Sequence, residues 1–166
     1  MSKRRFVLII AVSEYLDKGM PRLPGVRRDA EHLRSTLANH ADGGVYRIFW
    51  LTDSKATKQG ILNKLCEIAS QAGVTDQVII YFGGHGWREF DAASKCWKHY
   101  LIPYDATFVS ASTQRLSTDE LGAALNTLHT EELVLMLDCC HSGGMANFCW
   151  TNDILDELLS RLQKVR

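Results

Sequence analysis

Proline is scarce in this chain of 166 residues: it has three prolines, and no stretch rich in proline, glycine or serine divides it. Such stretches form linkers between domains, so their absence, like the length, favours a single domain. No internal repeat or low-complexity run is present. Hydrophobic residues make up 46% of the chain and charged residues 23%, which excludes an intrinsically disordered protein. The sequence therefore predicts one domain over residues 1–166.

An excess of charge is also missing, because 19 Lys and Arg balance 19 Asp and Glu. Binding of nucleic acid or an anionic membrane by bulk charge is therefore disfavoured. No run approaches the roughly 18 apolar residues that span a bilayer. The apolar run 6–12 follows basic residues, as in a signal peptide, but no small-residue cleavage site follows, and a buried strand explains it better. We expect a cytoplasmic protein without a nucleic-acid or membrane partner.

The cysteines are few and irregularly spaced: Cys66, Cys96, Cys139, Cys140 and Cys149. Their odd number and spacing exclude a disulfide framework and fit a reducing compartment. A zinc site formed by Cys139, Cys140, His141 and His85 is the alternative, but the two-residue spacer typical of such sites is missing. The three cysteines outside this group are expected to be small buried hydrophobic residues.

Strand-like and helix-like patterns alternate along the chain. Buried strands are expected at residues 5–12, 46–51, 77–82 and 133–137, and a hairpin around residues 97–102. Amphipathic helices are expected over residues 26–37, 61–69, 121–128 and 154–162, the third capped by Ser117 with Glu120. Strands buried on both faces and joined by helices predict an α/β fold, a three-layer α/β/α sandwich with a mostly parallel sheet.

Reactive side chains follow the third and fourth expected strands, in the loops FGGHGW and LDCCHSGG. Ligands of open α/β sheets bind outside the carboxyl ends of the strands. If these strands are neighbours, a histidine and a cysteine meet at one active-site mouth. An imidazole beside a thiol favours the thiolate and then protonates a leaving amine, which is the chemistry of a cysteine nucleophile. The glycines in both loops allow tight turns and the close approach of a peptide.

An ordered set of motifs runs along almost the whole chain: FVLIIAVSEY, LPGVRRDAEHL, FWLTDSKATKQGI, DQVIIYFGGHG, HYLIPYDA, LSTDELGAAL and LVLMLDCCHSGG. This set resembles the large-subunit part of the caspase-like cysteine peptidases. It is closer to metacaspases and their bacterial relatives, the orthocaspases, than to animal caspases. The caspase signature with glutamine before the cysteine is absent, and Asp-Cys-Cys-His-Ser-Gly stands in its place.

The resemblance implies that Cys140 is the nucleophile and His85 the catalytic histidine, 55 residues upstream. It also implies an oxyanion hole formed by the backbone N–H groups of Gly86 and Cys140. Cys139 is then a structural neighbour of the nucleophile. His141 stands where caspases commonly have arginine and is expected to line the site. In an extended segment, Asp138 and Cys140 project to one side and Cys139 to the other.

Asp138 and Asp29 match acidic residues that resemble the metacaspase P1 pocket, which binds the residue before the cleaved bond. A charge-assisted hydrogen bond is worth roughly 1.5–3 kcal/mol, so one carboxylate there favours a basic side chain by tenfold or more. We therefore expect cleavage of peptide or protein substrates after Arg or Lys. Structural roles remain as alternatives: Asp29 at the start of a helix and Asp138 at the end of a strand.

Many metacaspases depend on calcium, but here the corresponding neighbourhoods offer Lys98, His99 and Asn147. The pair Asp119 and Glu120 is a poor calcium site, since calcium usually takes roughly six to eight oxygen ligands. We expect no cofactor and calcium-independent activity. The metacaspase-like resemblance also suggests a regulated proteolytic stress or defence pathway, with an upstream activator among the partners. A catalytically silent caspase-like scaffold is the alternative function.

The family's domain continues with a small subunit that adds two more strands. Without it, the strand at residues 133–137 is a bare apolar edge, which proteins usually cover. The expected partner is a small catalytic subunit or the C-terminal remainder of the same precursor. The basic residue Arg166 is of the kind that we expect the enzyme to cut after, so self-processing there is one hypothesis and a designed truncation is the other.

Overall fold

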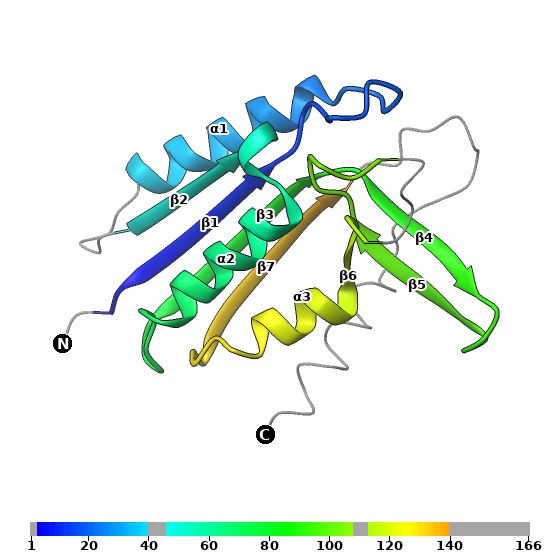
Figure 1. Cartoon of the computed structure of the whole chain (residues 1–166). Helices are drawn as coiled ribbons and strands as arrows, with labels where there is room; N and C mark the ends of the chain where they lie inside the picture. The colour runs from blue at the N-terminus through cyan, green and yellow to red at the C-terminus, as the bar shows by residue number, and fades with distance from the viewer. Residues whose placement is uncertain (1–2, 40–45, 108–112, 140–166) are drawn as a thin grey trace.

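The computed structural model describes residues 3–39, 46–107 and 113–139. Its main sheet has four parallel strands in the order β2-β1-β3-β7 (Figure 1). These strands are β1 (Arg5–Ala11), β2 (Tyr46–Thr52), β3 (Gln77–Gly84) and β7 (Glu132–Cys139). The helices are α1 (Pro24–Asn39), α2 (Lys58–Ala69) and α3 (Thr118–Leu125), with a short 3-10 helix at Asp53–Lys55. A smaller antiparallel sheet contains β4 (Gly86–Asp91), β5 (Cys96–Leu101) and β6 (Leu116–Ser117).

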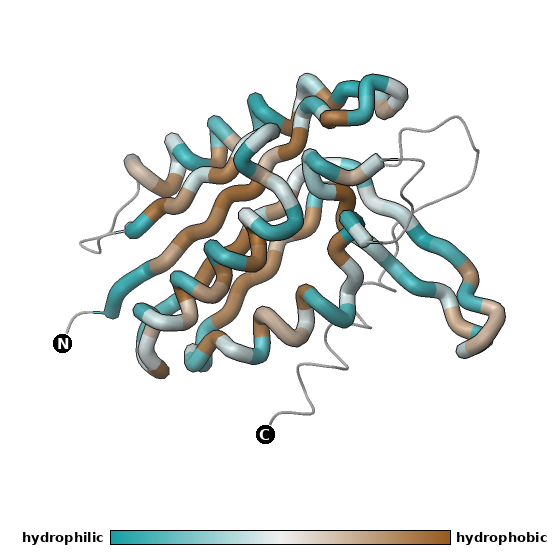
Figure 2. Tube along the Cα trace, viewed as in Figure 1, coloured by the Kyte–Doolittle hydropathy of each residue, from teal (hydrophilic) through white to brown (hydrophobic). Residues whose placement is uncertain are grey.

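Helices cover both faces of the main sheet, as Figure 1 shows. Val7, Ile9 and Ile79 project toward α1 and pack with its Val26 and Ala30. The alternate strand residues pack with α2 and α3 in the second core cluster: Phe6, Leu8, Ile10, Val78, Ile80 and Phe82. This burial on both faces explains the unbroken apolar runs of β1 and β3, which form the hydrophobic centre of the tube in Figure 2. The predicted three-layer α/β/α sandwich is confirmed.

The parallel direction brings the carboxyl ends of β1, β3 and β7 to one edge of the sheet. There β3 and β7 are direct neighbours, with Gly83 paired with Asp138 and Gly84 with Cys139. The side-by-side arrangement expected for the third and fourth strands is therefore present. At the same edge, the Val12 N–H donates to the Gly83 carbonyl at 2.9 Å and ties β1 to β3.

Two strands extend two residues beyond the prediction at their carboxyl ends. β3 does not end at Phe82 but continues through Gly84, and Asp138 and Cys139 belong to β7 rather than to a loop. The paired backbone groups of the two strands outweigh the turn preference of the two glycines. In the small sheet β4 was missed, since its charged sequence GWREFD lacks the apolar alternation of a half-buried strand.

Local predictions elsewhere had mixed outcomes. The cap of α3 is confirmed: the Ser117 side chain accepts a hydrogen bond from the Glu120 N–H, and the Glu120 side chain accepts from the Ser117 N–H. The expectation that Cys66 and Cys96 are buried was wrong, because both are exposed. Cys149 and the helix expected over residues 154–162 lie outside the described residues. In the part of the chain that the structure describes, no helix is long and apolar enough to cross a membrane.

An ion pair between the buried carboxylate of Asp76 and the exposed side chain of Arg4 fastens the opposite, amino-terminal edge of the sheet. The Asp76 carboxylate, on a residue 4% exposed, accepts hydrogen bonds from the backbone N–H and guanidinium of Arg4 and from the Gly73 N–H. These bonds, the guanidinium first, lower the pKa of Asp76 to about 2. Because this pKa lies below the ordinary carboxyl value of 3.8, ionised Asp76 stabilises the folded protein. Its contribution to the free energy of unfolding is complete above pH 3.8 and is lost as the pH falls toward 2.

We predict that Asp76→Asn lowers the free energy of unfolding by about 2 kcal/mol at neutral pH, since hydrogen bonds to a buried charge are lost. Denaturant unfolding measures this, and the difference from the wild type should shrink as the pH approaches 2. Asp91→Asn is the control: its pKa is also lowered to about 2, chiefly by Lys98, but on an accessible hairpin where ion pairs contribute little. Equal losses in both variants would contradict this view of Asp76.

Candidate active site

The backbone of His85 is fixed where β3 leaves the main sheet and β4 begins. Its N–H donates to the Tyr15 hydroxyl at 2.7 Å, and its carbonyl accepts from the Ile102 N–H at 3.0 Å. Tyr15 is 2% exposed, and this burial raises the pKa of its phenol, so the hydroxyl stays neutral as a hydrogen-bonding group. The half-buried imidazole of His85 is thus held at the carboxyl edge of the sheet.

The imidazole of His85 is also oriented by its neighbours. Its Nε2 lies 2.9 Å from the carbonyl oxygen of Pro21, and its ring stacks on the Tyr15 ring with 5.0 Å between centroids. A carbonyl can only accept a hydrogen bond, so Nε2 carries a proton in this arrangement. Nδ1 is therefore the basic nitrogen of the neutral ring. The same carbonyl also stabilises the imidazolium that forms when Nδ1 takes up a proton.

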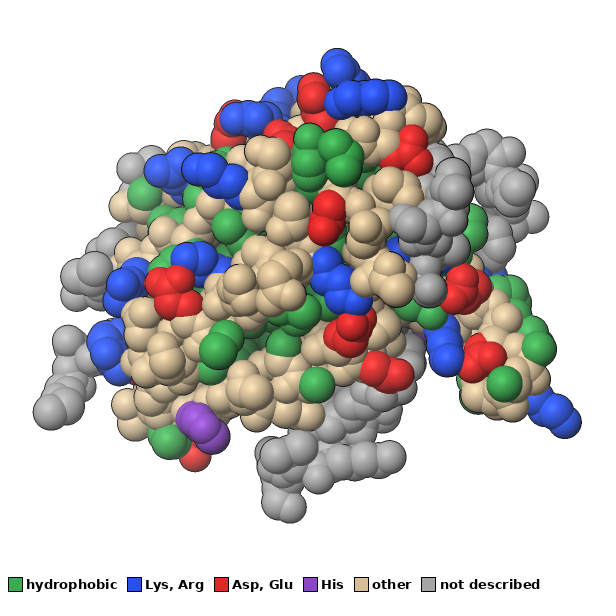
Figure 3. Space-filling model, viewed as in Figure 1, with side chains coloured by type: hydrophobic (Ala, Val, Ile, Leu, Met, Phe, Trp, Pro, Cys, Tyr) green, Lys and Arg blue, Asp and Glu red, His purple; other side chains and the backbone are tan. Residues whose placement is uncertain are grey.

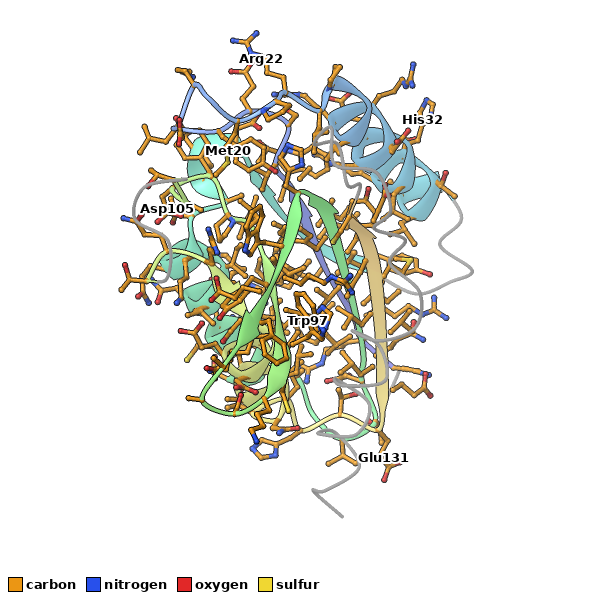
Figure 4. All side chains as sticks on the ribbon, turned by 90° about the vertical axis from the view of Figure 1, so that its right-hand side faces the viewer. Met20, Arg22, His32, Trp97, Asp105 and Glu131 are labelled. Carbon is orange, nitrogen blue, oxygen red and sulfur yellow. The ribbon has the colours of Figure 1, made fainter. Side chains whose placement is uncertain are left out.

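Tyr15 and Pro21 belong to one loop, between β1 and α1, and Asp53 fixes where this loop begins. The Asp53 Oδ1 accepts hydrogen bonds from the Ser13 N–H, the Ser13 hydroxyl and the Glu14 N–H, all at 2.9–3.0 Å. In the view of Figure 4, Met20 and Arg22 of this loop lie at the end of the molecule opposite Glu131, which precedes β7. The loop therefore lies over the carboxyl edge of the sheet.

Sequence reasoning missed Tyr15, Pro21 and Asp53. One signal was available: Asp53 directly follows β2, and Tyr15 follows β1 by a few residues, at the edge where open α/β sheets bind ligands. The contact between Pro21 and His85 had no such signal. It joins residues 64 positions apart through a main-chain carbonyl, which every residue type carries.

On β7, neighbouring residues project to opposite faces of the sheet. Asp138 lies on the α1 side, where its Oδ2 accepts a hydrogen bond from the Tyr81 hydroxyl at 3.2 Å. Cys139 packs against the cluster that faces α2 and α3. Cys140 and His141 lie outside the described residues, as does the backbone N–H of Cys140 expected in the oxyanion hole. Gly86 is the first residue of β4 and directly follows His85.

The two acidic residues expected in the P1 pocket lie on the same side of the sheet. Asp29 is exposed on α1, and both Asp29 and Asp138 raise the pKa of Tyr81, after the larger effect of burial. The Tyr81 hydroxyl thus has a direct hydrogen bond to Asp138 of β7 and a longer-range electrostatic interaction with Asp29 of α1. Asp29 lies within the helix rather than capping it, since α1 begins at Pro24.

No group of three or more His, Cys, Asp or Glu side chains suited to hold a metal ion occurs among residues 3–39, 46–107 and 113–139. Asp119 and Glu120 are both near basic side chains. The Glu120 carboxylate pairs with the Lys58 ammonium at 2.6 Å, and Asp119 raises the pKa of Lys98, a smaller effect than that of Asp91. Of the four zinc ligands considered as an alternative, the structure describes Cys139 and His85. The other two, Cys140 and His141, lie outside the described residues.

A family model described as the caspase domain, a peptidase family, matches residues 4–158. The chain belongs to the caspase-domain family. The matched family is a family of cysteine peptidases. No curated protein sequence matches this caspase domain.

Among solved structures, the caspase domain is similar to protein GSU0716 from Geobacter sulfurreducens, with a TM-score of 0.66 and 20% sequence identity. The match covers 84% of this chain and 52% of the other, so the caspase domain spans about half the length of that protein. At this identity the likeness concerns the fold.

We predict that His85 of the caspase domain populates one neutral tautomer, with the proton on Nε2, because the Pro21 carbonyl accepts a hydrogen bond there. ¹⁵N NMR of the histidine ring nitrogens distinguishes the two tautomers at a pH where the ring is neutral. His129, which is exposed, is the internal reference and should show a mixture. A dominant Nδ1–H signal from His85 would contradict the arrangement.

Proposed function

We propose that this caspase domain is the catalytic part of a cytoplasmic cysteine endopeptidase of metacaspase type, with Cys140 as nucleophile and His85 as general base. The oriented imidazole of His85 is the observation that carries the proposal. Cys140 follows Cys139, which pairs with Gly84, and Gly84 precedes His85. Consecutive Cα atoms are about 3.8 Å apart, so covalent connectivity alone keeps Cys140 close to the end of this strand pair.

In the proposed reaction, His85 alternately accepts and donates a proton. Nδ1 of His85 removes the proton from the Cys140 thiol, and the sulfur forms a bond to the carbonyl carbon of the substrate. The carbonyl oxygen becomes an oxyanion that the N–H groups of Gly86 and Cys140 stabilise. The carbon–nitrogen bond then breaks, and the imidazolium gives its proton to the leaving amine. Water hydrolyses the thioester, with His85 again as base, and restores the thiol.

Selection of Arg or Lys before the cleaved bond is assigned to Asp138 and Asp29. The protein has no net charge, and acidic and basic side chains alternate over the face seen in Figure 3, so recognition of a cationic side chain must be local. Asp138 bonds to the Tyr81 hydroxyl on the α1 side of the sheet, and Asp29, on α1 itself, acts on the same hydroxyl electrostatically. An Arg side chain presents five N–H donors to such acceptors, and a Lys ammonium three.

We further propose that a small catalytic subunit or C-terminal remainder of the same precursor pairs with β7. Among the described residues, β7 pairs with β3 alone, and its Val134 is 41% exposed. Strand edges of this kind are usually covered in native proteins. The similar G. sulfurreducens protein is about twice as long as the matched region, which agrees with additional elements.

Cys140→Ala should abolish cleavage of a peptide with Arg at P1, because no sulfur remains to attack the carbonyl. The measurement is hydrolysis of fluorogenic peptides that differ only in Arg, Lys or Asp at P1, with the full-length natural protein. Asp138→Asn should lower kcat/KM for the Arg peptide roughly tenfold or more, as expected when a charge-assisted hydrogen bond is lost.

Cys66→Ala is the matched control for the nucleophile, because Cys66 is an exposed thiol on α2, away from the carboxyl edge. It should leave all rates unchanged. Preference for Asp at P1 would overturn the proposed specificity. An intact, correctly folded protein that cleaves none of the peptides and whose Cys140 resists an arginyl electrophile would favour the silent scaffold instead.

We expect hydrolysis of the Arg peptide to be independent of calcium. The rate measured in excess EDTA should equal the rate after calcium is added back. The reason is that the Glu120 carboxylate forms an ion pair with Lys58 and, within the described ranges, is not part of a cluster of acidic residues that could bind calcium. Activity that disappears in chelator and returns with calcium would show that this expectation is wrong.

A further inference from the structure

Tyr81 lies within the motif DQVIIYFGGHG but has no role in the proposed reaction. It lies on β3, two residues before Gly83, on the face covered by α1, and is 7% exposed. Its hydroxyl reaches toward the carboxyl edge of the sheet: it lies 2.7 Å from where a Cβ on Gly83 would be. A side chain at position 83 would also meet the Val26 Cγ1 at 2.9 Å. Glycine at this position therefore makes room for the phenol.

Two carboxylates interact with the Tyr81 hydroxyl, Asp138 by a hydrogen bond and Asp29 electrostatically. On β7, the Asp138 Oδ2 accepts its hydrogen bond at 3.2 Å. On α1, Asp29 is close enough to act on the hydroxyl electrostatically, and Val26, from the same helix, reaches Gly83. Burial and both negative charges raise the pKa of Tyr81, so the phenol remains protonated and continues to donate.

We infer that Tyr81 is a specificity-determining residue of the P1 pocket, whose hydroxyl holds the Asp138 carboxylate in place and offers its own oxygen to a cationic side chain. This inference rests on the proposed function, because it concerns the same pocket. A phenol has one proton to donate and lone pairs that accept. With its proton given to Asp138, the Tyr81 oxygen is an acceptor for the N–H groups of a guanidinium or ammonium. The pocket then offers acceptors from three elements: β3, β7 and α1.

A hydroxyl that only stabilises the fold would affect stability and leave substrate discrimination unchanged. A hydroxyl that holds a binding carboxylate affects the binding of the cationic group, in the ground state and the transition state alike. Loss of such an interaction raises KM and leaves kcat nearly unchanged. The separation of KM from kcat therefore distinguishes the two roles.

The test is Tyr81→Phe in the full-length natural protein, which removes the oxygen and keeps the ring. KM for the Arg peptide should rise roughly tenfold, the range expected for one hydrogen bond to a charged group, with kcat changed less than twofold. Tyr100→Phe is the matched control. Tyr100 is 8% exposed on β5, and its hydroxyl also donates to a carboxylate, that of Glu89, at 2.8 Å. Denaturant unfolding of both variants shows whether their losses of stability are similar.

A second measurement does not depend on catalysis. Benzamidine, a small amidinium cation, is titrated into Cys140→Ala protein with and without Tyr81→Phe, and its affinity should fall about fivefold or more in the double variant.

The outcomes for Tyr81 and for the proposed function can be told apart. If the wild type cleaves after Arg but Tyr81→Phe behaves like Tyr100→Phe, the role of Tyr81 is wrong and the proposed function stands. If the wild type does not cleave after Arg or Lys, the proposed function fails. Equal benzamidine binding in that case also overturns the role of Tyr81, and weaker binding in the double variant supports it.

Discussion

The pairing of β3 with β7 is the constraint on which the candidate site depends. The register of the two strands pairs Gly83 with Asp138 and Gly84 with Cys139. It thereby determines which face of the sheet each side chain occupies. A shift by one residue would exchange the two faces, placing the Asp138 carboxylate against the apolar cluster under α2 and α3. The buried apolar residues on both faces oppose such a shift, because each strand would lose its packing with the helices.

Two tyrosines on opposite sides of the sheet hold the candidate site residues that this register positions. Tyr15, on the side of α2 and α3, holds the backbone of His85 and stacks on its ring, while Tyr81, on the side of α1, bonds to Asp138. Both are nearly inaccessible to solvent, so each hydroxyl must find partners inside the protein. The glycines of β3 are part of the same arrangement, since a Cβ on Gly84 would lie 3.2 Å from the Tyr15 hydroxyl.

The sandwich and the place of His85 were predictable because they follow from patterns within short segments. Apolar runs such as that of β1 mark strands buried on both faces, and parallel strands put their following loops at one edge. The strand ends were harder, since the extension through Gly84 depends on backbone pairing with β7 rather than on residue type. The partners of His85 were out of reach for a further reason: Pro21 contributes only its carbonyl, and the path of its loop depends on Asp53, a distant residue.

The role of the Pro21 carbonyl has a consequence for how this site can change in evolution. A side chain that orients a histidine is lost by a single nucleotide change, whereas a peptide oxygen survives every amino-acid replacement at its own position. Drift at position 21 alone therefore cannot remove the acceptor. The vulnerable positions are those that set the course of the loop, above all Asp53, whose one oxygen receives three hydrogen bonds from Ser13 and Glu14. Inherited loss of the hydrogen bond between the Pro21 carbonyl and His85 is therefore expected to arise at residues such as Asp53, which lie outside that contact.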